Sequence, residues 1–531
     1  MSSSRSPGLT TLNAEFLSAV EAVPDRVFMD FEGATFTYAA LEEQIRRLAR
    51  GLRALGIGRG DRVVSQLETG PEAVIAWFAI NRLGAINVPI NTAYMGHFLR
   101  HQVNDSGARL VICENAFASR FAALAGELPA VEHILFLGEE AERGSWSAGF
   151  APVDAHRIDA GETPSVPVAP GDLASIIYTS GTTGMSKGCI ASHNYFCDLP
   201  WRNAAAIGRT GDDIYWAPLP LFHIAGICVV VSSMMLRGTG SLARKFSLSN
   251  FWPEIERARP DVVMLLGSMA MMVAGEPDSD ASRRCYGKIR TLVAAPLPAE
   301  LPAIWKERFG LTWVTGRTYG STECGQALEA RFDSSDVPPS SCGRANQAFD
   351  VRIFDENDEE LGPDVVGEVV VRPRRPLVMY SGYWNDPAAT LAASRNLWHH
   401  MGDRARVDAQ GNFFFADRSK DVIRRRGENI SSYEMELTLA SHPAILEVAI
   451  HAVKSAVTED DVKATIVLRQ GATVSEPEML DWVRPLIPRF ALPRYIEFRA
   501  ELPKNPIGRV LKFQLREEGV TPTTWDSQVD A

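Results

Sequence analysis

The chain has 531 residues, of which 46% are hydrophobic and 22% are charged, a balance typical of a folded globular protein. Its 54 basic and 65 acidic residues give a formal net charge of −11, which argues against sequence-independent binding to nucleic acid or to an anionic membrane. This length exceeds a single ordinary core, so we expect several domains.

The cysteines and the N-terminal segment indicate the compartment. Seven cysteines are scattered along the chain and form no C-x-x-C pair, which favours a reducing compartment over a zinc or disulfide framework. Residues 1–7 lack the apolar core of a signal peptide, and the longest apolar stretch, 224–236, is too short to cross a bilayer. We therefore expect a cytoplasmic protein without a membrane span.

Strand and helix patterns alternate over the first 400 residues. Apolar residues recur at helical spacing over 41–55, and glycines 56 and 58 end that helix. A strand at 62–65, a helix over 71–84 and a strand at 85–89 follow. This rhythm predicts an α/β fold with a large N-terminal domain of βαβ-type subdomains and mainly parallel sheets.

A segment rich in glycine, serine and threonine, residues 178–188, follows the strand-like run 173–178. Its three glycines free the backbone, its hydroxyls can bond phosphate oxygens, and Lys187 supplies a compact positive charge. The segment therefore suits a polyphosphate. The same composition is also typical of a simple turn, so this segment alone does not decide.

The composition changes near residue 417. A charged stretch over 417–427 precedes a helix around 432–441, strands near 448–453 and 463–468, and a helix from Glu476. We expect a large domain over 1–417, a hinge at 418–421, a small mobile α+β domain over 422–520 and a disordered tail over 521–531. An ordinary surface loop is the alternative to the hinge.

Together with four later segments, residues 178–188 resemble the adenylate-forming superfamily of acyl-CoA synthetases, luciferases and peptide-synthetase adenylation domains. The five segments occur in the family order, and the resemblance covers roughly residues 12–517 and is strongest to acyl-CoA synthetases. It implies that a carboxylic acid reacts with ATP to give an acyl-adenylate and pyrophosphate. Coenzyme A then displaces AMP to give an acyl-CoA.

Three of these segments resemble the nucleotide motifs of the family. Tyr319 would stack on adenine, Thr322 would bond the α-phosphate, and Asp403 would accept hydrogen bonds from the ribose. Thr183 and Glu323 would serve Mg²⁺, which prefers oxygen ligands. The residues that the resemblance assigns to ATP or AMP are Thr179, Ser180, Gly181, Thr182, Thr183, Gly184, Lys187, Ala294, Ala295, Pro296, Tyr319, Gly320, Ser321, Thr322, Glu323, Asp403 and Arg418.

The segment at 219–223 resembles the motif at the mouth of the acyl pocket. Peptide-synthetase domains usually have aspartate where His223 stands, which argues against an α-amino acid substrate. Small and methionine-rich neighbours indicate a roomy apolar pocket, although ordinary core packing uses the same residues. The expected pocket residues are Phe222, His223, Gly226, Gly267, Ser268 and Met269.

The expected acid is bulky and apolar. A polycyclic or terpenoid acid would match the secondary-metabolite ligases that the chain resembles. Fatty, aryl and carnitine-like acids remain open.

The small domain is expected to deliver coenzyme A. By the resemblance, Lys420 occupies the hinge position, and 427–430 would line the pantetheine tunnel, where glycine lets a thiol arm pass close to backbone. The expected coenzyme A contacts are Arg426, Gly427, Glu428 and Asn429. The arginines at 424–426 equally suit a solvated surface.

Two positions depart from the family pattern. Ser186 stands where the family usually has proline, and Arg509 stands where it has the lysine that assists adenylation. Arginine keeps the charge but not the point geometry of lysine. Three alternatives stay open: Arg509 does the work, Lys504 or Lys512 replaces it, or adenylation is slow. The expected catalytic set is Lys187, Glu323 and Arg509, with Lys420 as the hinge.

Two competing functions remain at this point. One is a ligase that loads the phosphopantetheine of a carrier protein, and the other is a non-catalytic nucleotide-binding protein, motivated by Arg509. The expected partners are a small carboxylic acid, ATP, Mg²⁺ and coenzyme A, without nucleic acid. The family also makes a homodimer an option, although no segment identifies an interface.

Overall fold

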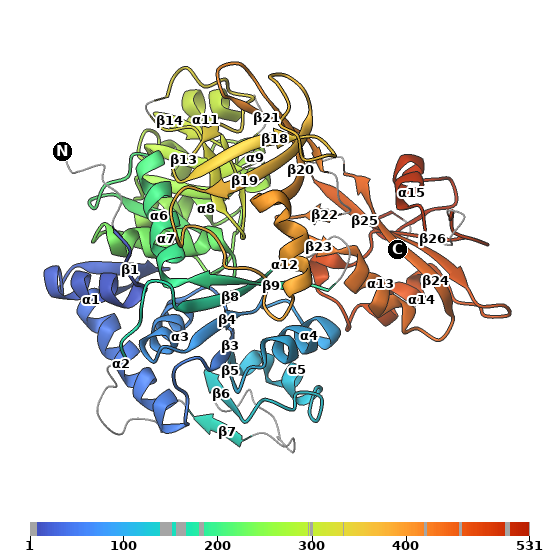
Figure 1. Cartoon of the computed structure of the whole chain (residues 1–531), viewed down its shortest axis with the longest axis horizontal. Helices are drawn as coiled ribbons and strands as arrows, with labels where there is room; N and C mark the ends of the chain where they lie inside the picture. The colour runs from blue at the N-terminus through green and yellow to red at the C-terminus, as the bar shows by residue number, and fades with distance from the viewer. Residues whose placement is uncertain are drawn as a thin grey trace.

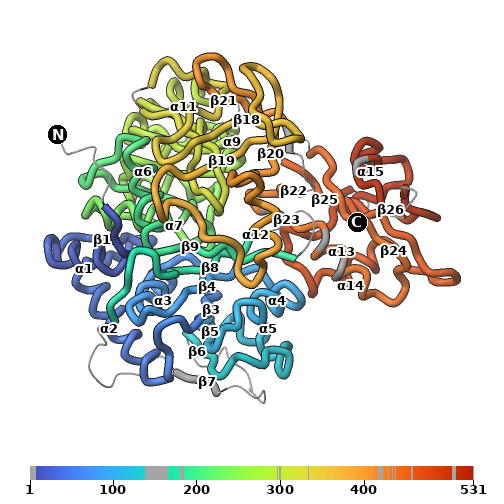
Figure 2. The backbone as a smooth tube through the Cα atoms, viewed as in Figure 1, coloured from blue at the N-terminus to red at the C-terminus, as the bar shows by residue number. Residues whose placement is uncertain are grey.

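The computed structural model describes residues 8–137, 151–154, 166–179, 185–295, 297, 301–332, 334–418, 422–455, 459–504 and 510–529. Figure 1 shows a large lobe built by the N-terminal four-fifths of the chain and a smaller C-terminal lobe beside it. The tube in Figure 2 follows the same division. In the described part of the chain, every helix is too short or too polar to span a bilayer.

Two seven-stranded sheets form the framework of the large lobe. In the first, all neighbours are parallel except β1 and β2. Its strands, in spatial order, are β14 (Trp313–Thr315), β13 (Thr291–Ala295), β12 (Val262–Leu266), β10 (Ile214–Ala217), β11 (Thr239–Leu242), β1 (Val27–Phe31) and β2 (Ala34–Thr37).

The second sheet repeats this plan, and only β8 and β9 are antiparallel. Its strands are β7 (Ala151–Asp154), β6 (His133–Leu137), β5 (Leu110–Glu114), β3 (Arg62–Gln66), β4 (Ile86–Pro89), β8 (Leu173–Thr179) and β9 (Lys187–Ser192). The two sheets confirm the predicted fold class of mainly parallel βαβ subdomains.

The helices connect these strands and cover the sheets (Figure 1). In the large lobe they are α1 (Leu12–Ala22), α2 (Tyr38–Ala54), α3 (Pro71–Arg82), α4 (Gly96–Ser106), α5 (Ala118–Ala122), α6 (His193–Ala206), α7 (Ile224–Met235), α8 (Phe251–Ala258), α9 (Gly267–Gly275), α10 (Asp280–Arg284), α11 (Leu301–Phe309) and α12 (Pro387–Ala393).

The sequence of α2 explains its local structure. Leu41, Ile45 and Leu52 recur at helical spacing and are fully buried, while the opposite face is charged. The Thr37 hydroxyl accepts the Ala40 N–H at the start of the helix, and Gly56 beyond its end adopts φ +79°. One apolar cluster joins α1, α2, α3, α6 and α7 to strands of both large sheets and holds the lobe together.

Two smaller antiparallel sheets complete the large lobe and carry two of the sequence motifs. The first consists of β15 (Thr318–Ser321), β16 (Gly325–Glu329) and β17 (Arg344–Ala345). The second consists of β18 (Phe349–Phe354), β19 (Gly367–Pro373), β20 (His399–Val407) and β21 (Phe413–Arg418).

The small lobe is α+β, as predicted, and has its own apolar core. A hairpin of β22 (Val422–Arg425) and β23 (Glu428–Ser431) precedes a mixed sheet in which β25 and β26 are parallel. The remaining elements are β24 (Ile445–Lys454), β25 (Asp460–Leu468), β26 (Tyr495–Phe498), β27 (Trp525–Asp526), α13 (Ser432–Ala440), α14 (Glu476–Val483) and α15 (Lys512–Glu518).

The prediction of a disordered tail over 521–531 is wrong for the described residues up to 529. β27 pairs with β26, and the Arg494 guanidinium lies 2.8 Å from the Asp526 carboxylate. This charged contact and the strand pairing give the tail a fixed place on the sheet. Of the predicted hinge, residues 419–421 lie outside the described part of the chain, so the domain boundaries remain predictions.

Candidate active site

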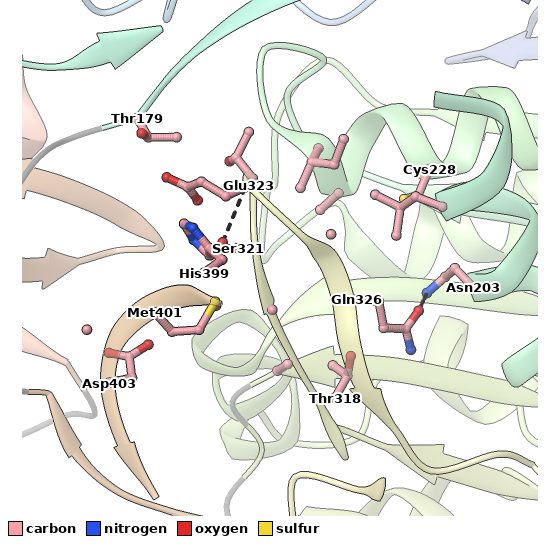
Figure 3. A pocket seen from close by; sticks show the side chains of 18 of the residues that line it. Thr179, Asn203, Cys228, Thr318, Ser321, Glu323, Gln326, His399, Met401 and Asp403 are labelled. Atoms are coloured by element: carbon pink, nitrogen blue, oxygen red, sulfur yellow. Dashed lines mark hydrogen bonds between the residues drawn. The ribbon is translucent and has the colours of Figure 1, made fainter. Parts of the chain in front are cut away.

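A cavity of about 810 Å³ opens where the two smaller sheets meet the ends of β8, β9, β12 and β13. Most of its wall belongs to the large lobe, and Arg424 contributes from the small lobe. Figure 3 shows that polar side chains from β15, β20 and the following turns gather on one side, around Glu323 and Asp403. Asn203 and Gln326 lie apart from them on the other side.

Glu323 is the central carboxylate of the first group. The Tyr383 hydroxyl donates to its Oε1 over 2.9 Å. Burial raises the pKa of Glu323, but nearby His399 and hydrogen bonds from Ser321 and Tyr383 outweigh this, so its pKa lies below the ordinary value. Glu323 is therefore ionised at neutral pH and offers hard oxygen ligands inside the cavity.

Tyr319 and Asp403 form a second polar contact beside Glu323. The Tyr319 hydroxyl donates to Asp403 Oδ2 over 2.8 Å, which ties β15 to β20. Asp403 and Met401 both line the cavity. Lys187, at the start of β9, lies with Nζ 5.2 Å from the centre of the Tyr383 ring, so a cation, a carboxylate and a phenol share this end.

The structure brings together many of the residues predicted to bind nucleotide. The cavity wall includes Thr179, Lys187, Ala295, Gly320, Ser321, Thr322, Glu323 and Asp403. Ala294 is buried behind it, and the backbone of Arg418 lies opposite Asp403 in the β20–β21 ladder. The predicted residues outside the described part of the chain are Ser180, Gly181, Thr182, Thr183, Gly184, Pro296, Lys420 and Arg509.

The acyl end of the cavity differs from the sequence-based expectation. The described residues that line the cavity do not include the six residues predicted for the acyl pocket, and neighbours such as Ile224, Ala225 and Leu266 line it instead. The six predicted residues are Phe222, His223, Gly226, Gly267, Ser268 and Met269. A Cβ atom on Gly226 would lie 2.4 Å from the Pro220 carbonyl oxygen, so the glycine allows the first turn of α7 to pack closely against the backbone of Pro220. The apolar wall includes Leu199, Ile207, Leu219, Ile224, Ala225, Cys228, Met264 and Leu266.

Polar residues on this wall that the motifs did not predict include Asn203 on α6, Gln326 on β16, and Arg317 immediately before β15. None of them belongs to a recognisable motif. Arg317 and Gln326 flank the motif at 319–323, and this position in the sequence is the one feature that could have indicated that they line the site.

Comparisons with known proteins match both lobes. The AMP-binding enzyme model matches residues 16–384, and the AMP-binding enzyme C-terminal domain model matches residues 434–509. The chain belongs to the AMP-binding enzyme family. This membership confirms the predicted adenylate-forming superfamily and the fold class.

A curated relative and two solved structures extend this match. Crotonobetaine/carnitine–CoA ligase of Salmonella paratyphi A is 29% identical over 495 residues, which cover 92% of this chain and 95% of the relative. A double mutant of Bacillus subtilis o-succinylbenzoate CoA synthetase, bound to the product analogue OSB-NCoA, has a TM-score of 0.81 at 25% identity and covers 96% of this chain and 99% of its own. These relatives support the predicted enzyme class of acyl-CoA synthetase.

The same Bacillus subtilis enzyme in complex with AMP has a TM-score of 0.67 at 24% identity, and the match covers 96% of this chain and 98% of that one. The fold of this AMP-binding enzyme thus agrees better with the structure that holds the product analogue than with the AMP complex.

The small lobe of this AMP-binding enzyme contacts the large lobe beside the cavity. His223 Nε2 lies 2.9 Å from Glu428 Oε2 on the β22–β23 hairpin. Burial lowers the pKa of His223, but the charge of Glu428 and its hydrogen bond outweigh this, so the pKa lies above the usual value. The pair is therefore an ion pair at mildly acidic pH.

Gly427 allows the hairpin to approach this closely. A Cβ atom at Gly427 would lie 2.2 Å from Leu266 Cδ1, and its φ of +81° favours glycine. Its N–H donates to Glu459 Oε2 over 2.9 Å. Of the neighbouring arginines, Arg426 is exposed, whereas Arg425 is buried and pairs with Asp461.

A second contact between the lobes uses Ser186, where the family usually has proline. The Ser186 N–H donates to Glu434 Oε1 on α13 over 2.9 Å, and the Gln102 amide donates to the Ser186 hydroxyl. Burial raises the pKa of Glu434, although the Ser186 hydrogen bonds oppose that shift. Proline has no N–H and could not form this contact.

The two lysines considered as replacements for Arg509 have partners within the small lobe. Lys504 Nζ lies 2.5 Å from Glu447 Oε1, and Lys512 Nζ lies 2.7 Å from Glu436 Oε1. Neither lysine is on the wall of the cavity. In this arrangement of the lobes, both are held away from the predicted nucleotide site.

Proposed function

We propose that this enzyme is an ATP-dependent acid–CoA ligase that forms an acyl-adenylate and then an acyl-CoA. The observation that carries the proposal is a cavity of about 810 Å³ that has a charged end at Lys187, Glu323 and Asp403 and an apolar end. The Gly427–Glu428 segment closes on the same cavity from the small lobe.

In the first half-reaction, an oxygen of the substrate carboxylate attacks the α-phosphorus of ATP. A new P–O bond forms, and the bond to the bridging oxygen breaks to release pyrophosphate. Lys187 balances charge on the leaving group, Tyr319 and Asp403 hold adenine and ribose, and Thr322 bonds the α-phosphate. Catalysis in such a transfer rests on positioning and charge stabilisation.

Glu323 fits Mg²⁺ because it is an ionised carboxylate that faces the cavity. Thr183 is the second proposed ligand. The metal supplies charge neutralisation at the phosphate oxygens. Arg509 is proposed to assist the same step, because Lys504 and Lys512 are paired elsewhere in the small lobe.

In the second half-reaction, the thiol sulfur of coenzyme A attacks the acyl carbonyl carbon. The C–S bond forms, the C–O bond to AMP breaks, and the thiol proton is lost. Gly427, Glu428 and Asn429 would line the path of the thiol arm, with Arg426 near the entrance. We propose a hinge at 418–421, centred on Lys420, between a large domain over 1–417 and a small domain over 422–520. This hinge would rotate the small domain between one arrangement for acyl-adenylate formation and another for thioester formation.

The acid is proposed to be bulky, mainly apolar and not an α-amino acid. The apolar wall, which includes Leu199 and Leu266, supports a bulky and mainly apolar acid. The absence of aspartate at position 223 argues against an α-amino acid. The test is to incubate the enzyme with ATP, Mg²⁺, coenzyme A and a panel of acids, and to measure AMP and acyl-CoA by mass spectrometry. A carrier protein as sole acceptor, or no AMP with any acid, would overturn the proposal.

A further inference from the structure

Two buried amides meet on the wall of the cavity, away from Glu323 and Asp403 (Figure 3). Asn203 on α6 and Gln326 on β16 each expose only 9% of their surface. Asn203 Nδ2 donates to Gln326 Oε1 over 3.3 Å. Asn203 Oδ1 is buried and has no hydrogen-bond partner within the described part of the chain. Because Gln326 accepts the Asn203 hydrogen bond with its Oε1, its Nε2 is the group that can donate to a ligand.

Such a pair is costly in an apolar pocket. Burial of a polar atom without a partner costs about 1–3 kcal/mol, so buried amides are normally satisfied. Leu199 and Ile207 on the cavity wall have no hydrogen-bonding side chain, and Cys228 has only a weak thiol. Of the polar side chains on the wall, Arg317 donates to the Val337 carbonyl and Thr318 to the Leu328 carbonyl. The open acceptor and the open donor therefore call for a partner that enters the cavity.

The pair is held in place by contacts on both elements. Arg202, next to Asn203, donates to the Gln326 backbone carbonyl over 2.8 Å and is itself paired with Asp198 over 2.6 Å. Gly325 brings β16 so close to α6 that a Cβ atom there would lie 2.8 Å from the side chain of Leu199. The two amides are thus fixed by the packing of a helix against a strand.

A neighbouring group adds donor character to the same part of the wall. Arg317 donates to the Val337 carbonyl over 2.6 Å and forms no ion pair with any described carboxylate. Its carbonyl accepts the Ala330 N–H, and Ala330 lines the cavity, as does Ala206 on the helix that carries Asn203. Burial lowers the pKa of Arg317. An oxygen atom is the ligand that suits this surface.

We propose that the acid substrate carries a hydroxyl group remote from its carboxylate, and that Gln326 and Asn203 recognise it. The hydroxyl oxygen would accept from Gln326 Nε2, and its hydrogen would be donated to Asn203 Oδ1. The inference rests on the proposed function and narrows the acid to an apolar body with a distal hydroxyl group.

The test uses sets of three acids. The acids of one set share a carbon skeleton and differ only at the position furthest from the carboxylate, and the sets differ in chain length. One is unsubstituted, one carries a hydroxyl, and one carries a ketone. For the wild-type enzyme we expect kcat/KM for acid-dependent AMP release to be at least about tenfold higher for the hydroxy acid than for the parent acid. The keto acid should rank between them, because it satisfies Gln326 alone.

Two variants at position 326 separate recognition from packing. Gln326→Met keeps the length of the side chain but removes the donor, so the preference for the hydroxy acid should fall to about one while the parent acid is still activated. Gln326→Glu still accepts from Asn203 and from a hydroxyl, so it should keep the hydroxy acid and reject the keto acid. Met264→Leu, on the apolar wall, is the control and should change kcat/KM for all three acids by a similar factor.

The outcomes keep this inference distinct from the proposed function. If the wild-type enzyme releases AMP with none of the acids of this or the wider panel, the proposed function fails. If it activates the acids without preferring the hydroxyl, or if Gln326→Met leaves the preference unchanged, the inference alone is overturned. A keto acid that outperforms the hydroxy acid would also overturn it.

Discussion

The two ends of the cavity are specified in different ways. At the charged end, Lys187, Tyr319, Glu323 and Asp403 each come from a recognisable segment and converge within one site. At the apolar end, the wall is assembled from α6, α7, β12 and β16, and none of its polar residues belongs to a motif. The charged end therefore indicates the reaction class, whereas the apolar end decides the substrate.

The largest expected effect tests the charged end. Glu323→Gln should lower AMP formation by about 10²–10³-fold with every acid, because it removes an ionised oxygen ligand from the site of charge development. The rate is measured by AMP release at saturating ATP. Glu329→Gln, on the neighbouring strand and bonded to Asn346, is the matched control and should retain activity. Loss with only one acid would place Glu323 in acid recognition instead.

The second prediction concerns the small lobe. Gly427→Val should slow thioester formation by about 30-fold while pyrophosphate exchange stays intact, because the new side chain meets Leu266 at positive φ. Gly471→Val is the control, since that glycine has a similar φ of +79° but open space around it. Equal losses in both half-reactions would contradict a role for Gly427 in the second step alone.

A smaller effect is expected from the second contact between the lobes. Ser186→Pro removes the N–H that donates to Glu434, which should shift the equilibrium away from this arrangement by about tenfold. Ser186→Ala keeps the N–H and serves as the control. The distance between labels on the two lobes, measured by fluorescence transfer, reports the shift. An unchanged distribution in Ser186→Pro would show that this hydrogen bond has no influence.

The smallest expected effect is the pH dependence of the His223–Glu428 contact. The pKa of His223 is raised in this arrangement, so the ion pair stabilises it fully below the ordinary value and is lost as pH rises through the raised value. Arg424, which also faces His223, opposes the shift. Because the His223 side chain is 43% exposed, we expect a change of only about 1.4–5-fold in the domain equilibrium. His223→Gln should flatten this profile, and an identical profile in that variant would exclude the pair as its source.

The sequence predicted the fold and the charged end well because both depend on local patterns. Helical spacing in α2, the strand before residue 178 and the motif at 319–323 each report a short stretch of chain. The apolar wall depends on how α6 packs against β16. Its two amides, Asn203 and Gln326, are 123 positions apart in the chain, so no short stretch of sequence reveals their contact. The contact of Ser186 with Glu434 spans 248 positions, and no local pattern could reveal it. The pairing of β27 also depends on a distant strand, which explains the incorrect tail.

The route of the carboxylate oxygen tests the central proposal most directly. An acid accepted by the enzyme is labelled with ¹⁸O in its carboxylate and converted with ATP and coenzyme A in a single turnover. Attack on the α-phosphorus predicts one ¹⁸O atom in each AMP molecule, with one acyl-CoA formed per AMP. Label in inorganic phosphate with release of ADP, or AMP without label, would contradict the acyl-adenylate route.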